Sequence, residues 1–323
     1  MVRCVLEVTF INVGYGDAIL VESNGFTLLL DGGSALTGEF KDFPFRIPAA
    51  EYIKQTGLSK IDLMILSHIH EDHIGGLEAI FDQVSVGEIR LPYDPALFLK
   101  GTTLAAARSV PPSVHLFTSA LLATIRILEL AKHQAIPVKV LQNGDRILLS
   151  SGIELDVLAP SFETKQSFEN LLTEALTAED STKALLDLDR TANESSLLLK
   201  VSAENTALLL SADHCPDKWS PEFFSALQNV NVLKLPHHGQ KDSISEEVFS
   251  KMPLTHVITT ASSDRRYHSA NPEVYNTLLR LHPNVTLLFT DERDYPPYFQ
   301  NPDGARAIKL VIDSRGIHTE FIR

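Results

Sequence analysis

Three short apolar runs of this chain each end in histidine and aspartate side chains, and this pattern constrains the fold more than any other. Residues 61–66 (IDLMIL) lead into SHIHEDH, residues 208–212 lead into Asp213, and residues 232–236 lead into His237 and His238. Apolar runs of this length are typical of strands that are covered on both faces. Sites of α/β proteins lie at the carboxyl ends of such strands. The pattern therefore predicts an α/β fold with a polar site at these strand ends.

The rest of the chain alternates predicted strands and helices. Asn24-Gly25 between two apolar runs predicts a hairpin, residues 49–56 and the stretch after Gly75-Gly76 predict helices, and residues 101–136 predict a long helical region. Residues 161–193 are polar and acidic, which predicts a surface insertion. The strand-rich halves, 1–160 and 194–323, favour a layered α/β sandwich over a parallel Rossmann sheet. We expect one domain over residues 1–323.

Charge and cysteine content limit the setting in which this chain works. Its 28 basic and 41 acidic residues give a net charge of −13, which repels polyanions and argues against stable binding of duplex DNA. Two cysteines, Cys4 and Cys215, make no disulfide framework and favour a cytoplasmic location. The apolar stretch 114–131 is interrupted by charges and is short for a membrane span. We expect no membrane association; the oligomeric state stays open.

The segment after the first run carries the strongest chemical signal. His68, His70, Asp72 and His73 lie within six residues, more metal-ligand side chains than one catalytic ion normally uses. This density predicts two divalent metal ions, with zinc favoured and manganese or iron as alternatives. Asp213 is suited to bridge them, because a carboxylate offers two oxygens between two cations. Either His237 or His238 would complete the second site.

Six segments along the chain resemble the metallo-β-lactamase superfamily, and within it the hydrolase domain of ComEC-type competence proteins and phosphorylcholine esterases. They are VGYGDAILVE (13–22), LLLDGG (28–33), SHIHEDHIGGL (67–77), NESSLLLKV (193–201), LLLSAD (208–213) and VLKLPHHGQKDS (232–243). The resemblance implies a four-layer αββα sandwich, a dinuclear metal site between its halves, and hydrolysis. It also implies that Asp31 and Asp17 lie behind the ligands, where a carboxylate can orient a ligand histidine.

The chain departs from this resemblance at two positions. Many relatives carry another histidine ligand where this chain has Asn193, and the ComEC-like pattern usually has serine where Gln240 stands. An amide is a poor zinc ligand, so the first metal site is expected to be weaker or to prefer manganese. No segment matches the transmembrane region of competence proteins, so we do not expect a role in DNA uptake.

Several other polar residues have both a functional and a structural interpretation. Arg265 or Arg266 can hold a phosphoryl oxygen, and His268 can protonate a leaving group. The alternative is an exposed polar loop. Lys241 and Ser243 are further candidates for phosphate contacts. His214 is expected to face away from the metals, and Cys215 to be an inert buried thiol rather than a ligand.

These residues together predict a binuclear metal-dependent phosphodiesterase that acts on a small phosphodiester or a short single-stranded nucleic acid. A hydroxide that bridges the metals would be the nucleophile, and Asp72 or His268 would handle the proton. Two alternatives remain open. One is a hydrolase of carboxylic esters, thioesters or lactams, and the other is a metal-binding partner protein whose active site has decayed.

Overall fold

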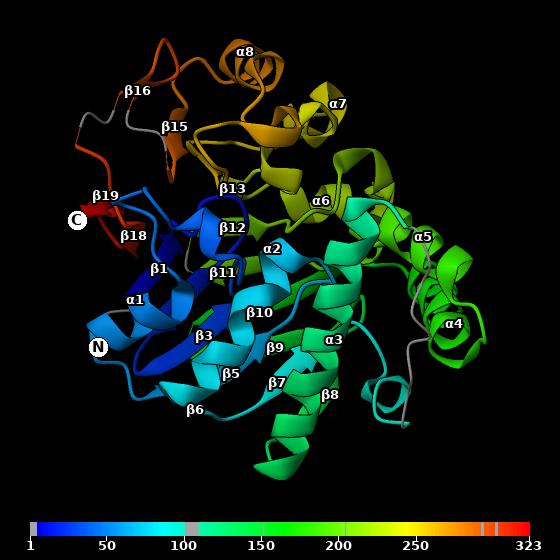
Figure 1. The fold of residues 1–323 in the computed structure, drawn as a ribbon. Coiled ribbons are helices and arrows are strands. Elements are labelled where there is room, and N and C mark those ends of the chain that lie inside the picture. The colour runs from blue at the N-terminus through cyan, green and yellow to red at the C-terminus, as the bar shows by residue number, and fades with distance from the viewer. Residues whose placement is uncertain (1–4, 101–109, 151, 204, 292–293, 301–302) are drawn as a thin grey trace.

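The computed structural model of the protein describes residues 5–100, 110–150, 152–203, 205–291, 294–300 and 303–323. Within these ranges the chain forms two large sheets that face each other between helices (Figure 1). One apolar cluster fills the space between the sheets, and two others lie between the outer faces of the sheets and the helices. The predicted four-layer αββα sandwich is thus confirmed. Cys4 and the start of the predicted 101–136 helix lie outside the described residues.

The first sheet has, in the described ranges, the strand order β19-β18-β1-β2-β3-β5-β7-β8. Its strands are β1 (Leu6–Ile11), β2 (Ile19–Ser23), β3 (Phe26–Leu30), β5 (Leu63–Ile65), β7 (Ile89–Leu91), β8 (Val138–Val140), β18 (Ala307–Asp313) and β19 (Gly316–Ile322). Strands β2 and β3 form the predicted hairpin, and Asn24 and Gly25 have φ values of 50° and 80°. Positive φ at both central residues is what a tight hairpin turn of type I′ requires.

The second sheet has the order β15-β14-β13-β12-β11-β10-β9 among the described residues. Its strands are β9 (Arg146–Ser150), β10 (Ile153–Ala159), β11 (Leu198–Ala203), β12 (Thr206–Leu210), β13 (Val230–Lys234), β14 (His256–Thr259) and β15 (Thr286–Phe289). Two short pairs are β4 (Lys60–Ile61) with β6 (Ser85–Val86), and β16 (Asp294–Tyr295) with β17 (Phe299–Gln300). The sheets divide the chain differently from the predicted halves, because β9 and β10 pair with β11, and β18 pairs with β1.

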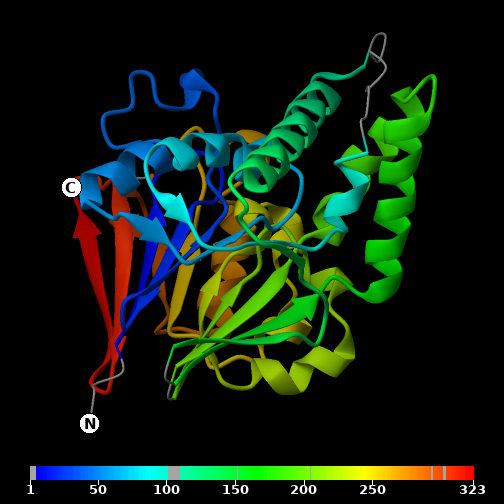
Figure 2. The ribbon, with the colours of Figure 1, turned by 90° about the horizontal axis from the view of Figure 1, so that it is seen from below.

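Helices cover the outer faces of both sheets. Against the first sheet's cluster lie α1 (Ala49–Thr56), α2 (Glu71–Ile74), α3 (Pro112–His133), α4 (Phe162–Thr177) and α5 (Thr182–Thr191). On the second sheet's side are α6 (Phe224–Leu227), α7 (Glu246–Phe249) and α8 (Pro272–Leu281). Figure 2 shows α1 and α3 outside the blue strands of the first sheet. Among helices of the described ranges, α3 alone is long and apolar enough to cross a bilayer, and 50% of that apolar window is buried inside the protein.

The segment 161–193 differs from the expected surface insertion. It forms α4 and α5, and each helix buries an apolar face in the cluster that also holds α3. Phe168 and Leu172 of α4 and Leu185 and Leu188 of α5 are at most 2% exposed. The overall composition of the segment is polar, which suggests a surface insertion. Its apolar residues nevertheless recur at the spacing of an amphipathic helix.

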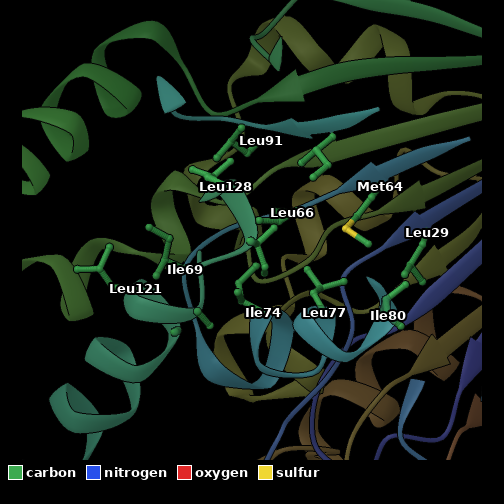
Figure 3. Packing of buried hydrophobic residues seen from close by; sticks show 14 of the residues in the cluster. Leu29, Met64, Leu66, Ile69, Ile74, Leu77, Ile80, Leu91, Leu121 and Leu128 are labelled. Atoms are coloured by element: carbon green, nitrogen blue, oxygen red, sulfur yellow. The ribbon is translucent and has the colours of Figure 1, made fainter. Parts of the chain in front are cut away.

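Apolar residues interleaved with the histidines fix the segment 67–77 on the first sheet. Figure 3 shows Leu66, Ile69, Ile74 and Leu77 packed with Met64 and its neighbours. After α2 the chain continues as the 3-10 helix Gly75–Asp82, so the helix predicted after Gly75-Gly76 already begins at Gly75. Gly76 donates its N–H to the carbonyl of Gly33, and a Cβ at Gly76 would lie 2.1 Å from the carbonyl oxygen of Gly32. The backbone contact therefore requires glycine at this position.

This contact predicts that Gly76→Ala lowers the free energy of unfolding by about 1–3 kcal/mol, since the added methyl group must push two backbone segments apart. Denaturant titration followed by circular dichroism measures the change. Gly38→Ala is the matched control, because a Cβ there meets nothing within 4 Å. Equal unfolding midpoints for the two variants would contradict the prediction.

Candidate metal centre

Three loops that follow β5, β12 and β13 meet at one end of the sandwich. The first loop carries His68 and His70 and leads into α2, which holds Asp72 and His73. The second carries Asp213, and the third carries His238 in the 3-10 turn Pro236–Gly239. The His237 N–H donates to the carbonyl of Ala212, which links the second and third loops. The loops come from both sheets, so the αββα layering itself assembles the site.

One group of donor atoms consists of the side chains of Asp72, His73, Asp213 and His238. The His73 Nε2 and His238 Nε2 atoms are each 3.3 Å from Asp213 Oδ1 and 3.3 Å from each other. His238 Nε2 is also 3.1 Å from Asp72 Oδ2. Donor atoms on one tetrahedral zinc ion, at metal–ligand distances of about 2.0–2.1 Å, lie about 3.3 Å apart. The group therefore fits a single divalent cation.

A second group consists of His68, His70 and the same Asp213. The His68 Nε2 atom lies 3.1 Å from His70 Nδ1 and 3.8 Å from Asp213 Oδ2. Asp213 Oδ2 thus faces this group, whereas Oδ1 faces the first group. Oδ1 is buried and makes no well-formed hydrogen bond among the described residues, although two imidazole nitrogens lie 3.3 Å from it. A buried carboxylate oxygen with such neighbours fits cation binding.

The charges of the two groups are strongly coupled. Burial alone would lower the pKa of His238, but the carboxylates of Asp213 and Asp72 outweigh burial and raise this pKa to about 9. The pKa of His73 is raised in the same way. Burial raises the pKa of Asp213, yet His238 and His73 hold that pKa well below its usual range. At neutral pH without cations, the His73 and His238 rings of the first group are therefore protonated and pair with the ionised carboxylates of Asp72 and Asp213.

Two further carboxylates lie directly behind the ligand side chains. Asp31 Oδ2 is 2.8 Å from His73 Nδ1, and both Asp31 oxygens accept hydrogen bonds from Ser67. Such a contact fixes the ring and leaves Nε2 free to face a cation. Asp17 accepts from Thr260 and pairs with the fully buried Lys234 at 2.5 Å. Lys234 was not predicted as a site residue. A lysine inside an apolar strand is unusual, and it could have indicated a buried polar site.

The two neighbouring histidines of the third loop have different surroundings. His238 lies in the first donor group, and its Nδ1 is 2.7 Å from the carbonyl oxygen of Thr260. His237 lies outside both groups. Its Nδ1 is 2.9 Å from Asp242, and its Nε2 is 2.8 Å from Gln240 Nε2 and 3.2 Å from Asn193 Nδ2. The structure thus distinguishes the two candidates and places Asn193 beside His237.

A pocket of about 480 Å³ opens above the two donor groups. Its lining includes His70, Asp72 and Asp213, an apolar wall from α3 with Leu116 and Phe117, and the polar side chains of Tyr15, Gln240 and Arg266. Tyr15 and Asp189 are two of the lining residues that were not predicted as site residues. Tyr15 belongs to the quoted segment 13–22, and its hydroxyl accepts from Gln240 Nε2 at 3.0 Å. Asp189 of α5 lies 3.9 Å from His70 Nε2, and nothing in its polar surroundings in the sequence marks it.

The loop residues expected to bind substrate take different places. Arg266 lines the pocket and pairs with Glu39 and Asp264. Arg265 lies over the ring of Tyr295, with its guanidinium 4.1 Å from the ring centre. The other three do not line the pocket: His268 is exposed, Lys241 pairs with Glu273, and Ser243 is buried. His268 therefore has no contact that supports the predicted proton transfer, because the exposed 3-10 turn Arg266–His268 carries it outside the lining.

Protonation of His238 makes cation binding depend on pH. Because the pKa of His238 is about 9 without a cation, its proton must leave before the ring can bind one. We expect the apparent affinity for zinc to rise by about 10-fold per pH unit between pH 7 and 9 for each proton displaced. Chelator-buffered zinc titrations measure it, with His268→Gln as the control that leaves the slope unchanged. A flat affinity over this interval would refute the expectation.

Comparisons with known proteins agree with this architecture. The family model described as the metallo-beta-lactamase superfamily matches residues 11–150. ComE operon protein 3 of Bacillus subtilis (strain 168) is 24% identical over 324 residues, which are 96% of this chain and 35% of that protein. The chain thus spans about a third of the length of this curated relative.

Two solved structures also show distant similarity to the chain. Igni18, a metallo hydrolase from Ignicoccus hospitalis, is 12% identical, with 94% of this chain and 98% of that chain covered and a TM-score of 0.46. CmlA, a diiron beta-hydroxylase from Streptomyces venezuelae, is 11% identical, with 96% and 54% covered and a TM-score of 0.48. The matched residues 11–150 include His68, His70, Asp72 and His73, so this part of the chain resembles the metallo-β-lactamase superfamily.

Proposed function

We propose that the protein is a binuclear metal-dependent phosphodiesterase that acts on a small phosphodiester or a short single strand. The observation that carries this proposal is the position of Asp213, whose two carboxylate oxygens face two separate donor groups at the base of one pocket. His68 and His70 with Asp213 would hold one cation, and Asp72, His73 and His238 with Asp213 would hold the other. Zinc suits these imidazole and carboxylate donors, and manganese and iron are alternatives.

Divalent cations bound here would supply Lewis-acid activation of water and of a phosphoryl oxygen. The chain's own residues prepare that chemistry. Asp31 orients His73, and the pair of Lys234 with Asp17 balances charge behind the ligands. Asp189 Oδ1 lies 3.9 Å from His70 Nε2 and adds negative charge beside that ring. Burial raises the pKa of the Asp72 carboxyl, but His73 and His238, whose Nε2 is 3.1 Å away, outweigh burial and lower it, so Asp72 stays ionised as a ligand.

Tyr15 is a better candidate than His268 for a hydrogen-bond donor to the substrate. Burial and the nearby Asp72 raise the pKa of Tyr15, so its hydroxyl stays protonated. The hydroxyl oxygen already accepts from Gln240, which leaves its O–H free to donate into the pocket. A donor placed there can stabilise charge on a non-bridging or leaving oxygen.

The pocket favours a compact substrate with one anionic and one apolar part. Arg266 supplies a guanidinium at the rim, and Leu116 and Phe117 supply an apolar wall. Glu39, Glu71 and Asp189 also line the pocket, and together with the net charge of −13 they disfavour a long polyanion. We also propose a cytoplasmic location with no membrane partner. The low cysteine content and the negative charge of the chain support this location.

The two neighbouring arginines allow a matched test of phosphate recognition. Arg266→Gln should lower kcat/KM for a bis-aryl phosphate about 10-fold or more, because a charged hydrogen bond contributes about 1.5–3 kcal/mol. Arg265→Gln should leave kcat/KM near the wild-type value, since Arg265 lies over Tyr295. Steady-state kinetics with each candidate metal give both numbers. Equal losses in the two variants would argue against Arg266 as the phosphate contact.

The same assay separates the proposal from its alternatives. The apolar wall also suits an acyl group, so an aryl ester, a thioester and a β-lactam belong in the substrate panel. The proposal requires the bis-aryl phosphate to be turned over fastest. Faster cleavage of a carbonyl substrate would favour the acyl hydrolase. Two bound metals with no turnover of any member would favour a metal-binding partner protein.

A further inference from the structure

A third group of potential ligands lies beside the metal centre but shares no residue with it. Cys215, His237 and Asp242 each offer one donor atom, and the three atoms lie within 4.8 Å of one another. The Cys215 Sγ atom is 3.9 Å from His237 Nδ1, which in turn is 2.9 Å from Asp242 Oδ2. They come from three places in the chain: the loop after β12, the turn after β13, and the 3-10 turn Lys241–Ser243. Their convergence is therefore a product of the fold.

The three side chains range from buried to exposed, so a cation could reach them from solvent. Cys215 is 9% exposed, and the side chains of His237 and Asp242 are 19% and 53% exposed. The thiol thus forms the base of the group and the carboxylate its mouth. Sulfur, imidazole nitrogen and carboxylate oxygen are all zinc ligands, at about 2.3, 2.0–2.1 and 2.0–2.2 Å. Two pairs of these donor atoms are 2.9 and 3.9 Å apart and all three atoms lie within 4.8 Å, so small movements would let them meet one such ion.

A second observation concerns the far nitrogen of His237. A histidine that binds a cation through Nδ1 carries a proton on Nε2, and this proton needs an acceptor. The Asn193 Nδ2 atom lies 3.2 Å from His237 Nε2, and Asn193 Oδ1 is buried without a hydrogen-bond partner among the described residues. A half-turn of the Asn193 amide would bring Oδ1 to that position. The change would satisfy both the unpaired oxygen and the Nε2 proton. Gln240 Nε2, now 2.8 Å from His237 Nε2, would then keep only its hydrogen bond to the Tyr15 hydroxyl.

We infer that Cys215, His237 and Asp242 form a separate site for one zinc-like divalent cation. On binding, the Cys215 thiol releases its proton to solvent, and the fourth position stays open to water at the Asp242 side. The ion would fix the turn in which His237 and His238 both have positive φ, at 46° and 55°. His238 belongs to the metal centre, so an ion at this third group would hold one of the centre's ligands in place.

Cobalt substitution tests this site directly, because a thiolate bound to Co²⁺ gives intense near-ultraviolet charge-transfer absorption and the main centre contains no sulfur donor. Metal-free, reduced protein is titrated with Co²⁺ while this absorption and the visible ligand-field bands are recorded. We expect three Co²⁺ per wild-type chain with the sulfur band present. In Cys215→Ser and in Asp242→Asn the band should be lost or weakened at least 10-fold.

Two controls keep the outcome specific. Cys4→Ser should retain the sulfur band, which assigns the band to Cys215. Cys215→Ser should retain two bound Co²⁺ and the ligand-field bands of the histidine-rich centre, which shows that the variant is folded. Absence of the sulfur band at three equivalents of Co²⁺, or its persistence in Cys215→Ser, would overturn the inference. The sulfur band is read without any turnover, so failure of this inference is distinguishable from failure of the proposed phosphodiesterase activity.

Discussion

The buried carboxylate of Asp213 is the constraint on which the rest of the site depends. An ionised carboxylate that is 2% exposed is costly unless positive charge surrounds it. Here the protonated rings of His73 and His238 and the more distant Lys234 ammonium supply that charge. Burial lowers the pKa values of His68 and His70, so these two rings face the other carboxylate oxygen without charge. Asp17 and Asp31 then balance Lys234 and His73 from behind. Removing any one partner leaves another buried charge uncompensated, so the cluster behaves as a unit and holds three loops from two sheets together.

The two sheets contribute different residues to this cluster. The first sheet presents the segment with His68, His70, Asp72 and His73, and the apolar residues between them anchor it under α3. The second sheet presents Asp213 and His238 from adjacent parallel strands. Helices α3 and α5 then build the pocket wall above the donor atoms, with Phe117 and Asp189 facing inward. The candidate ligands thus follow strands of the two sheets, whereas α3 and α5 supply part of the pocket wall.

Much of this architecture is predictable from the sequence, because short apolar strands with polar ends produce strong local signals. The segment from His68 to His73, the hairpin at Asn24-Gly25 and the helix at 49–56 are examples. Local sequence patterns do not predict the position of a residue that is set by contacts between distant parts of the chain. The polar helices α4 and α5 join the core through an apolar face that composition hides, and Asp189 reaches the pocket only through that packing. The different places of His237 and His238 follow from backbone geometry, since both have left-handed φ in one tight turn.

The central claim is that Asp213 lies between two cation sites. Anomalous diffraction at the zinc edge, from crystals of zinc-loaded protein, tests it most directly because it locates each ion without relying on activity. The account predicts two peaks on opposite sides of the Asp213 carboxylate. One peak would lie among His68 and His70, and the other among Asp72, His73 and His238. A single peak beside Asp213, or none, under saturating zinc would contradict the account.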